Sequence, residues 1–486
     1  MIFLNEILKF LTFRRFLLFS IFLILFLPRG VGIYFGKPFL PILDLPRVSM
    51  ALLIFAWIIK KVLKKEPLKI YVNNATVIFL FFIFLQFLSI FVSSRLIVSA
   101  TQWIGFVLCY YIIYFIILDE IKELHDCKQI IKVIMVTTVC LAILACAEAI
   151  SGHCLYSHMR TAWIANPFSC FKPNLHREQF FFSYGPYGSP HDFGLFFAGT
   201  FFLFLTRFCA VQKSWRDRIV MFAFSLLVFI GLLATQTRGA FYAVIIISLI
   251  SLFLIKFKDY FGMLIKVTAI IMLSVILFFT FTGKTMDYFK RWYVGNLWSY
   301  GEKKNGLSGR IYAVQKVLPL FRKAPLAENT PLAENTPLAE NTPLAENTPL
   351  AENTPLAEKG HYMSFLGYGL GAFSKAAWVP SPINVGPDLN IYMGIALESG
   401  VLTALLFVIF IILSCLNLWK FYRLQKDSEK AWLILGILLS LISYFVAHFV
   451  GAYLDSSLFF FILLAISQVL TSSKYILIPH SVKAKM

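Results

Sequence analysis

Long apolar runs separated by short polar segments make up most of the chain. An α-helix needs about 20 predominantly apolar residues to cross the hydrocarbon core of a bilayer. Twelve runs approach or exceed this length, at 13–28, 48–63, 75–93, 99–118, 130–150, 189–206, 218–235, 239–255, 262–282, 391–417, 431–450 and 457–473. The pattern predicts an all-α polytopic membrane protein with about 12 transmembrane helices. No small-residue cleavage site follows the first run, so we expect an uncleaved span.

Composition supports the same class. Hydrophobic residues form 59% of the 486 residues, and charged residues only 14%. A soluble protein of this length could not cover its surface with so few charges. The net charge of +19 does not require a nucleic-acid partner, because lysine and arginine flank transmembrane spans and determine their orientation. We therefore expect membrane lipids, and no nucleic acid, as partners.

The distribution of basic residues predicts the orientation. If the N-terminus is cytoplasmic, the inner segments hold 25 of the 44 lysines and arginines, the short outer loops hold 8, and a long insert holds 11. The positive-inside rule counts only short loops. The expected protein is multi-pass with both termini in the cytoplasm, and segments 151–188 and 282–390 face outward.

This topology divides the chain into three parts. Residues 1–281 form spans 1–9, residues 282–390 form an outer insert between spans 9 and 10, and residues 391–486 form spans 10–12 and a cytoplasmic tail. Within the insert, 325–360 repeats the hexapeptide Pro-Leu-Ala-Glu-Asn-Thr, and a proline at every sixth position prevents a continuous helix. The repeat is either an acidic arm or a tandem duplication tolerated in an exposed loop. Cys154 and Cys170 share one outer loop and would pair only in an oxidising compartment.

Two arginines of the outer segments are candidate anion ligands. Arg238 lies in the tight outer turn Thr235–Ala240, on the side where the topology rule disfavours a cation. It is either an interfacial snorkelling residue or a phosphate ligand, because a guanidinium binds phosphate oxygens through a bidentate fork. Arg310, at the start of an amphipathic stretch in the insert, is either a solvated charge or a second such ligand.

The remaining polar candidates lie at the outer ends of two spans. Asp388, Asn390 and Glu398 lie beside or within the tenth run, where carboxylates are expensive to bury and therefore functional candidates. His191 and Asp192 begin the sixth run and are alternatively a helix cap. No cysteine and histidine spacing typical of a metal site occurs, and the glycines near Gly369 and Gly371 lack the strand–helix context of a nucleotide site. We expect no metal and no cofactor.

These motifs, in this order, resemble the O-antigen ligase and polymerase superfamily of bacterial envelope glycosyltransferases. Thr235–Ala240 resembles the family's Ser-Arg-Gly turn, and Gly185–Ala198 its Gly…Asn-Pro-Asn segment. Gly309-Arg310, Ala324-Pro325 and Leu366–Phe373 resemble its Arg…Pro…Gly-x-Gly-x-Phe pattern. Asn390, with nine residues before Gly400, resembles its His-Asn-x9-Gly-x-x-Gly motif. The family histidine falls on Leu389, and the last glycine falls on Thr403.

The resemblance implies a metal-independent inverting glycosyltransferase of the bacterial inner membrane. It would move a glycan from an undecaprenyl diphosphate carrier to a lipid A-core acceptor at the periplasmic face. On this alignment the implied catalytic residues are Arg238, Arg310, Asp388 and Asn390. The implied substrate-binding residues are His191, Asp192, Gly369, Gly371 and Glu398. Leucine cannot act as the base that activates the acceptor hydroxyl, so Asp388, Glu398 or His191 would replace the histidine.

Other functions remain open at this stage. A polymerase of the same fold would join repeat units instead of transferring them to lipid A-core, and a pilin-type oligosaccharyltransferase is a third version. A polysaccharide transporter or flippase belongs to a different class, and such proteins usually show repeated halves and polar groups at mid-bilayer. Leu389 also leaves open an inactive remnant.

Overall fold

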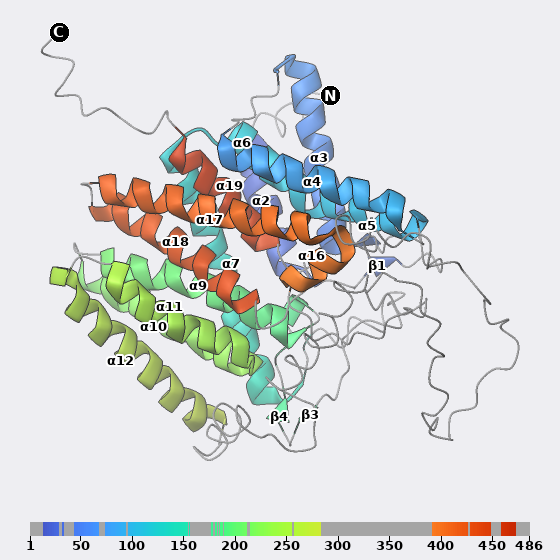
Figure 1. The fold of residues 1–486 in the computed structure, drawn as a ribbon. Helices are drawn as coiled ribbons and strands as arrows, with labels where there is room; N and C mark the ends of the chain where they lie inside the picture. Colours follow the sequence, from blue (N-terminus) through green and yellow to red (C-terminus); the bar gives the residue numbers. More distant parts are fainter. Residues whose placement is uncertain are drawn as a thin grey trace, which may run out of the picture.

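In the computed structural model, the described part of the chain is a bundle of helices (Figure 1). The structure describes residues 13–28, 32–33, 43–67, 73–93, 96–153, 155, 176–177, 180–181, 183, 185–187, 189–210, 214–254, 257–282, 391–425, 428–448 and 458–472. The helices of the first half are α2 (Phe13–Phe26), α3 (Leu45–Lys64), α4 (Asn74–Val92), α5 (Leu96–Phe106), α6 (Ile112–Glu120) and α7 (Leu124–Ser151). The helices of the second half are α9 (Pro190–Ala210), α10 (Trp215–Thr235), α11 (Arg238–Leu254), α12 (Phe257–Thr282), α16 (Ile391–Ser399), α17 (Val401–Leu424), α18 (Ser428–His448) and α19 (Leu458–Thr471).

Strands are confined to two small antiparallel pairs within the described residues. β1 (Gly32–Ile33) pairs with β2 (Leu43–Asp44), and β3 (His176–Arg177) pairs with β4 (Phe180–Phe181). The all-α polytopic class is thus confirmed. Seven helices of the described residues are long and apolar enough to cross a membrane, and three further apolar helices, including α19, are shorter.

Each of the twelve apolar runs coincides with a helix, with two departures from regularity. The run at 99–118 forms α5 and α6, joined by a π-helical turn at Val107–Tyr111. The run at 391–417 is divided at Gly400, whose φ of 95° lies in the region that glycine tolerates best. α16 has 9 residues, about 14 Å at the helical rise, so it cannot span the bilayer and α17 forms the span.

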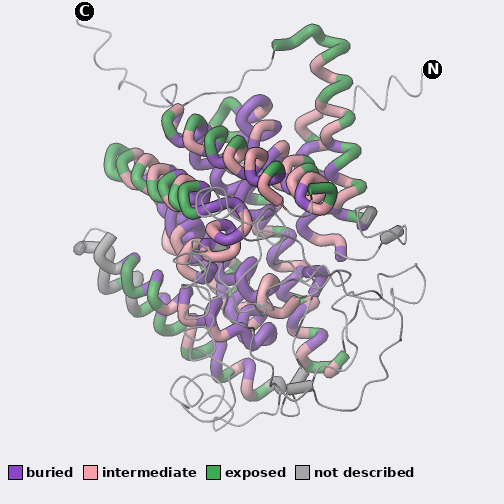
Figure 2. Tube along the Cα trace, turned by 45° about the vertical axis from the view of Figure 1, so that its right-hand side comes forward, coloured by how far each residue is buried: buried purple, intermediate pink, exposed green. Residues whose placement is uncertain are grey.

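The core of the bundle lies around α9 and α19. Every residue from Leu458 to Leu470 is buried, and α9 packs against α7, α10, α11 and α18. Gly199 of α9 allows α19 to approach closely, because a Cβ atom there would lie 2.7 Å from the ring of Phe459. Buried positions follow the centre of the bundle and exposed positions its outer faces (Figure 2). Large apolar side chains such as Phe55 and Leu63 are exposed on those faces, as expected where lipid is the solvent.

Contacts between helix ends define two opposite ends of the bundle. At one, Lys60 and Lys61 of α3 form ion pairs with Glu120 and Asp119 of α6. At the same end Arg14 of α2 pairs with Asp126 of α7, and the Nδ2 of Asn73 donates to the Oε1 of Gln468 of α19 at 2.7 Å. These residues lie in segments that the charge pattern assigns to the inner side, or at the inner ends of the runs that flank them. We call this the lysine end, and the opposite one, which carries the turn between α10 and α11, the Arg238 end.

Candidate active site

The turn that bears Arg238 connects two helices over only two residues. α10 ends at Thr235, Gln236 adopts a left-handed conformation with φ of 54°, and α11 begins at Arg238. The Gln236 amide donates to the carbonyl of Leu233 at 3.0 Å, and the Thr235 hydroxyl to Leu232 at 2.7 Å. These bonds complete the last turn of α10. Thr235, Gln236 and Thr237 are buried, whereas Arg238 is half-buried.

This turn packs directly against the start of α9. The Thr237 hydroxyl donates to the carbonyl of Pro190 at 2.8 Å, and the amide of Ser183 donates to the carbonyl of Ala234 at 3.2 Å. A Cβ atom at Gly194 would lie 2.6 Å from that of Thr237, so only glycine permits this approach. The structure therefore brings together two motifs that the sequence predicts to face outward, one at 185–198 and one at 235–240.

The contact places two helix N-termini side by side. α9 begins at Pro190 and α11 at Arg238, and each N-terminus carries the positive end of a helix dipole. A guanidinium beside two such ends gives a local field that favours phosphate oxygens. His191 and Asp192 lie in the first turn of α9, both half-buried. They follow Pro190 within the helix, so neither is the residue immediately before its first turn.

A buried carboxylate holds the segment that leads into α9. Glu148, near the end of α7, is fully buried. Its Oε2 accepts hydrogen bonds from the Ser183 hydroxyl at 2.6 Å and the Gly185 amide at 3.1 Å, and its Oε1 accepts from the Leu155 amide at 3.1 Å. Gly185 has a φ of 49° and stands against the ring of Phe193. Glu148 thus links α7 to both flanks of the segment between α7 and α9. Glu148 is not among the residues predicted from the sequence, although a lone carboxylate in an apolar run is a signal of function.

α16 brings Glu398, the one described polar candidate of the third segment, to the same end. The Tyr392 hydroxyl donates to the carbonyl of Phe445 in α18 at 2.9 Å, and its ring lies 6.3 Å from that of Phe407 in α17. α16 therefore lies alongside α17 instead of continuing it (Figure 1). Glu398, the residue before the last one of α16, is half-buried.

His448, the last residue of α18, is close to Tyr392. Its imidazole is 2% exposed, with Nδ1 2.7 Å from the carbonyl of Tyr444 and Nε2 without a hydrogen-bond partner among the described residues. The ring lies with Tyr392, Phe407, Phe445 and Phe460 around a small hollow. One of the two ring nitrogens of His448 is therefore satisfied within the described structure.

Several predicted site residues lie outside the described residues. These are Arg310, Asp388, Asn390, Gly369 and Gly371, together with the repeats at 325–360 and the pair Cys154 and Cys170. Arg238, His191, Asp192 and Glu398 are described. Within the described part of the chain, no group of three or more histidine, cysteine, aspartate or glutamate side chains is arranged to hold a metal ion.

Comparison with known families tests the resemblance. Residues 223–327 match the family model described as O-antigen ligase. The resemblance that the motifs indicated is confirmed over this segment, which is 105 of the 486 residues. No curated protein and no solved structure matches the chain. The O-antigen ligase match contains the whole of α11 with Arg238 and continues through Arg310 to the first residues of the repeats.

Proposed function

We propose that the chain is an O-antigen ligase-type glycosyltransferase of the bacterial inner membrane. It moves a glycan from an undecaprenyl diphosphate carrier to a lipid A-core acceptor at the periplasmic face. The observation that carries the proposal is the position of Arg238. It lies within the matched segment, at the N-terminus of α11, in a turn bonded to the N-terminus of α9.

The proposed transfer is a single displacement at the anomeric carbon of the carrier-linked sugar. The acceptor hydroxyl oxygen forms the new glycosidic bond, the bond from carbon to phosphate oxygen breaks, and its electron pair leaves with the diphosphate. Arg238 and Arg310 neutralise the charge that develops on the diphosphate, which is electrostatic stabilisation of the transition state. No metal is assigned to this step.

The hydroxyl proton passes to a base that this chain must supply without the family histidine, since Leu389 stands at its position. Asp388, Glu398 and His191 are the proposed alternatives, with Asn390 and Asp192 orienting the acceptor. Gly369 and Gly371 would let the insert backbone approach the glycan. The half-buried positions of Glu398 and His191 at the Arg238 end support their inclusion.

Deletion of the gene, followed by electrophoresis of the lipopolysaccharide, tests the reaction. A ligase predicts loss of all long-chain lipopolysaccharide with accumulation of lipid-linked polymer. A polymerase, which the same family match also supports, predicts core bearing a single repeat unit. A transporter predicts lipid-linked repeat units trapped in the cytoplasmic leaflet. An unchanged profile refutes both enzymatic versions.

Reporter fusions test the proposed orientation separately. Alkaline phosphatase joined within 325–360 should be active, because it folds only outside the cytoplasm, and the same reporter joined after Lys474 should be inactive. The reverse pattern would place Arg238 in the cytoplasm, away from any periplasmic acceptor.

A further inference from the structure

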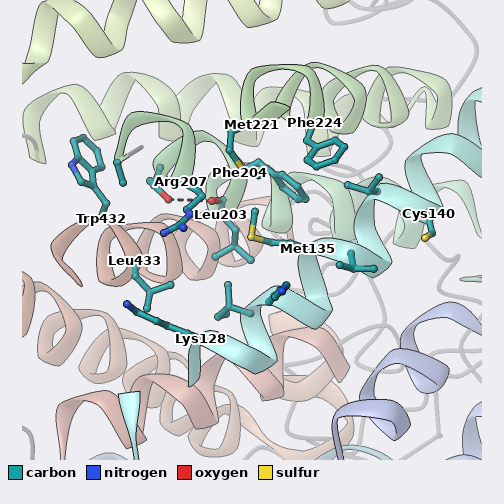
Figure 3. Close-up of a pocket in the computed structure, with 16 residues that line it drawn as sticks. Lys128, Met135, Cys140, Leu203, Phe204, Arg207, Met221, Phe224, Trp432 and Leu433 are labelled. Carbon is teal, nitrogen blue, oxygen red and sulfur yellow. Dashed lines mark hydrogen bonds between the residues drawn. The ribbon is translucent and has the colours of Figure 1, made fainter. Parts of the chain in front are cut away.

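A cavity among the described residues lies at the lysine end, opposite the proposed active site. It has a volume of about 560 Å³ and lies between α7, α9, α10 and α18 (Figure 3). Such a volume is within the range of small-molecule sites. Nothing in the proposed transfer uses this cavity, so its lining must be explained separately.

The lining combines basic and apolar side chains in a definite order. Lys128 and Lys132 stand one turn apart on α7, so both point from the same face of the helix. Arg207, near the end of α9, lies with Lys128 and Trp432 at one end of the cavity, whereas Cys140 and Phe224 lie toward the other (Figure 3). No aspartate or glutamate occurs among the lining residues that the structure describes. The basic end therefore favours an anion.

The rest of the lining offers almost no polar group. Aliphatic, aromatic and sulfur side chains follow α7 inward from the basic end, including Met135, Val139 and Cys140. The one neutral hydroxyl, that of Thr206, already donates to the carbonyl of Phe202 at 2.7 Å. A ligand of this cavity must consequently be anionic at one end and apolar over most of its length.

The dimensions fit a lipid of one leaflet. Along α7 the lining extends from Lys128 to Cys140, which is about 18 Å at the helical rise. One leaflet contributes about half of the ~30 Å hydrocarbon core. Tryptophan is enriched at the membrane interface, and Trp432 marks that level at the basic end.

We propose that this cavity binds an anionic glycerophospholipid of the leaflet at the lysine end. Its phosphate is held by Lys128, Lys132 and Arg207, and an acyl chain extends along α7 toward Cys140. Basic pockets between transmembrane helices are suited to such headgroups. The site is separate from that of the diphosphate carrier, which the proposed function places at the Arg238 end, and it does not depend on that function.

Lipid binding by the purified full-length chain tests the site. Native mass spectrometry would count phosphatidylglycerol and phosphatidylcholine bound from equimolar mixed micelles. We expect tighter binding of phosphatidylglycerol, and its loss in the variant Lys128→Gln/Lys132→Gln/Arg207→Gln. Each basic side chain near an anionic lipid contributes about fivefold, so three should weaken binding on the order of a hundredfold.

A matched variant controls for net charge. Lys64→Gln/Lys65→Gln/Arg216→Gln removes three exposed cations that do not line the cavity, and it should bind phosphatidylglycerol as the unmodified chain does. Val139→Trp keeps every cation and fills the apolar part, so it should also lose the bound lipid. Its melting temperature in detergent would show that it is folded.

Three results would overturn the proposal. The first is equal binding of phosphatidylglycerol and phosphatidylcholine, and the second is equal loss of phosphatidylglycerol in both triple variants. The third is displacement of phosphatidylglycerol by polyprenyl phosphate at equal or lower concentration, since this would make the carrier lipid the preferred ligand.

Discussion

Glu148→Gln is expected to reduce glycan transfer although Glu148 is not a proposed catalytic residue. The carboxylate accepts three hydrogen bonds from described groups, two on Oε2 and one on Oε1. Glutamine has the same size but only one accepting oxygen. If that oxygen keeps the Ser183 hydroxyl and the Gly185 amide, the new NH₂ group faces the Leu155 amide, and two donors meet.

The loss can be estimated bond by bond. A hydrogen bond to a charged group contributes about 1.5–3 kcal/mol, and a buried donor left without an acceptor costs about 1–3 kcal/mol. Glu148→Gln removes at least one charged bond, so we expect about 2–4 kcal/mol of destabilisation. Ser183→Ala removes a single donor and should cost about 1–3 kcal/mol on the same basis. The two effects should not add, because both residues belong to one hydrogen-bond network.

Two measurements, of stability and of transfer activity, test this structural role of Glu148. The apparent melting temperature in detergent should fall in Glu148→Gln, and transfer to lipid A-core in vitro should fall further than the loss of folded protein explains. The reason is that the Gly185 segment leads into α9, whose first residue is bonded to the Arg238 turn. Glu123→Gln is the control, because Glu123 is exposed at the other end of α7 and its side chain makes no capping bond. A Glu148→Gln variant with full stability and full transfer would refute the reasoning.

Three further substitutions test other parts of the structure. Arg238→Ala should abolish glycan transfer, and Arg238→Lys should retain little transfer activity, because an ammonium lacks the bidentate fork of a guanidinium. A normal amount of long-chain lipopolysaccharide in a deletion strain complemented with the alanine variant would remove Arg238 from the mechanism. Asp119→Ala should destabilise the fold by about 3–5 kcal/mol and lower the melting temperature, because it removes the partner of Lys61 at 2.5 Å and of the Trp57 indole at 2.9 Å. Glu66→Gln is the control, since it loses only a 3.8 Å pair with Lys61. Equal melting temperatures of the two variants would contradict this prediction. Gly199→Ala should destabilise the chain by about 1–3 kcal/mol, because the new methyl group meets the Phe459 ring. Gly105→Ala should be neutral or stabilising, because no neighbouring atom lies within 4 Å of the added Cβ atom. Equal melting temperatures of these two variants would refute close packing at α9.

The helices could be predicted from the sequence because the membrane leaves few alternatives. A long apolar run within a bilayer must satisfy its own backbone groups, and a helix does so within one segment. Each predicted run accordingly contains a helix, from Phe13–Phe26 to Leu458–Thr471. The break at Gly400 could not be predicted in this way. Glycine is common in transmembrane helices, and Ile391–Ser399 is as apolar as the span that follows it.

The candidate site was predictable only in part, for a different reason. The sequence identified Arg238 and the His191-Asp192 pair as separate signals, but their proximity depends on Gly194 and Thr237 allowing α9 to approach the turn. Glu148 could have been noticed as a lone charge, yet its partners Ser183 and Gly185 are 35 and 37 residues away. The cavity at the lysine end arises from four helices and has no local signature.

The position of α9 would allow one chain to hold the two proposed anionic lipid groups at opposite membrane faces. Its first turn is bonded to the Arg238 turn, and Arg207 in its last turn lines the cavity at the lysine end. The helix is 21 residues long, about 31 Å at the helical rise, which matches the hydrocarbon core. Phosphates recognised near its two ends would therefore lie in different leaflets. A single lipid could not occupy both places, so the carrier at Arg238 and the phospholipid at Arg207 would bind without direct competition.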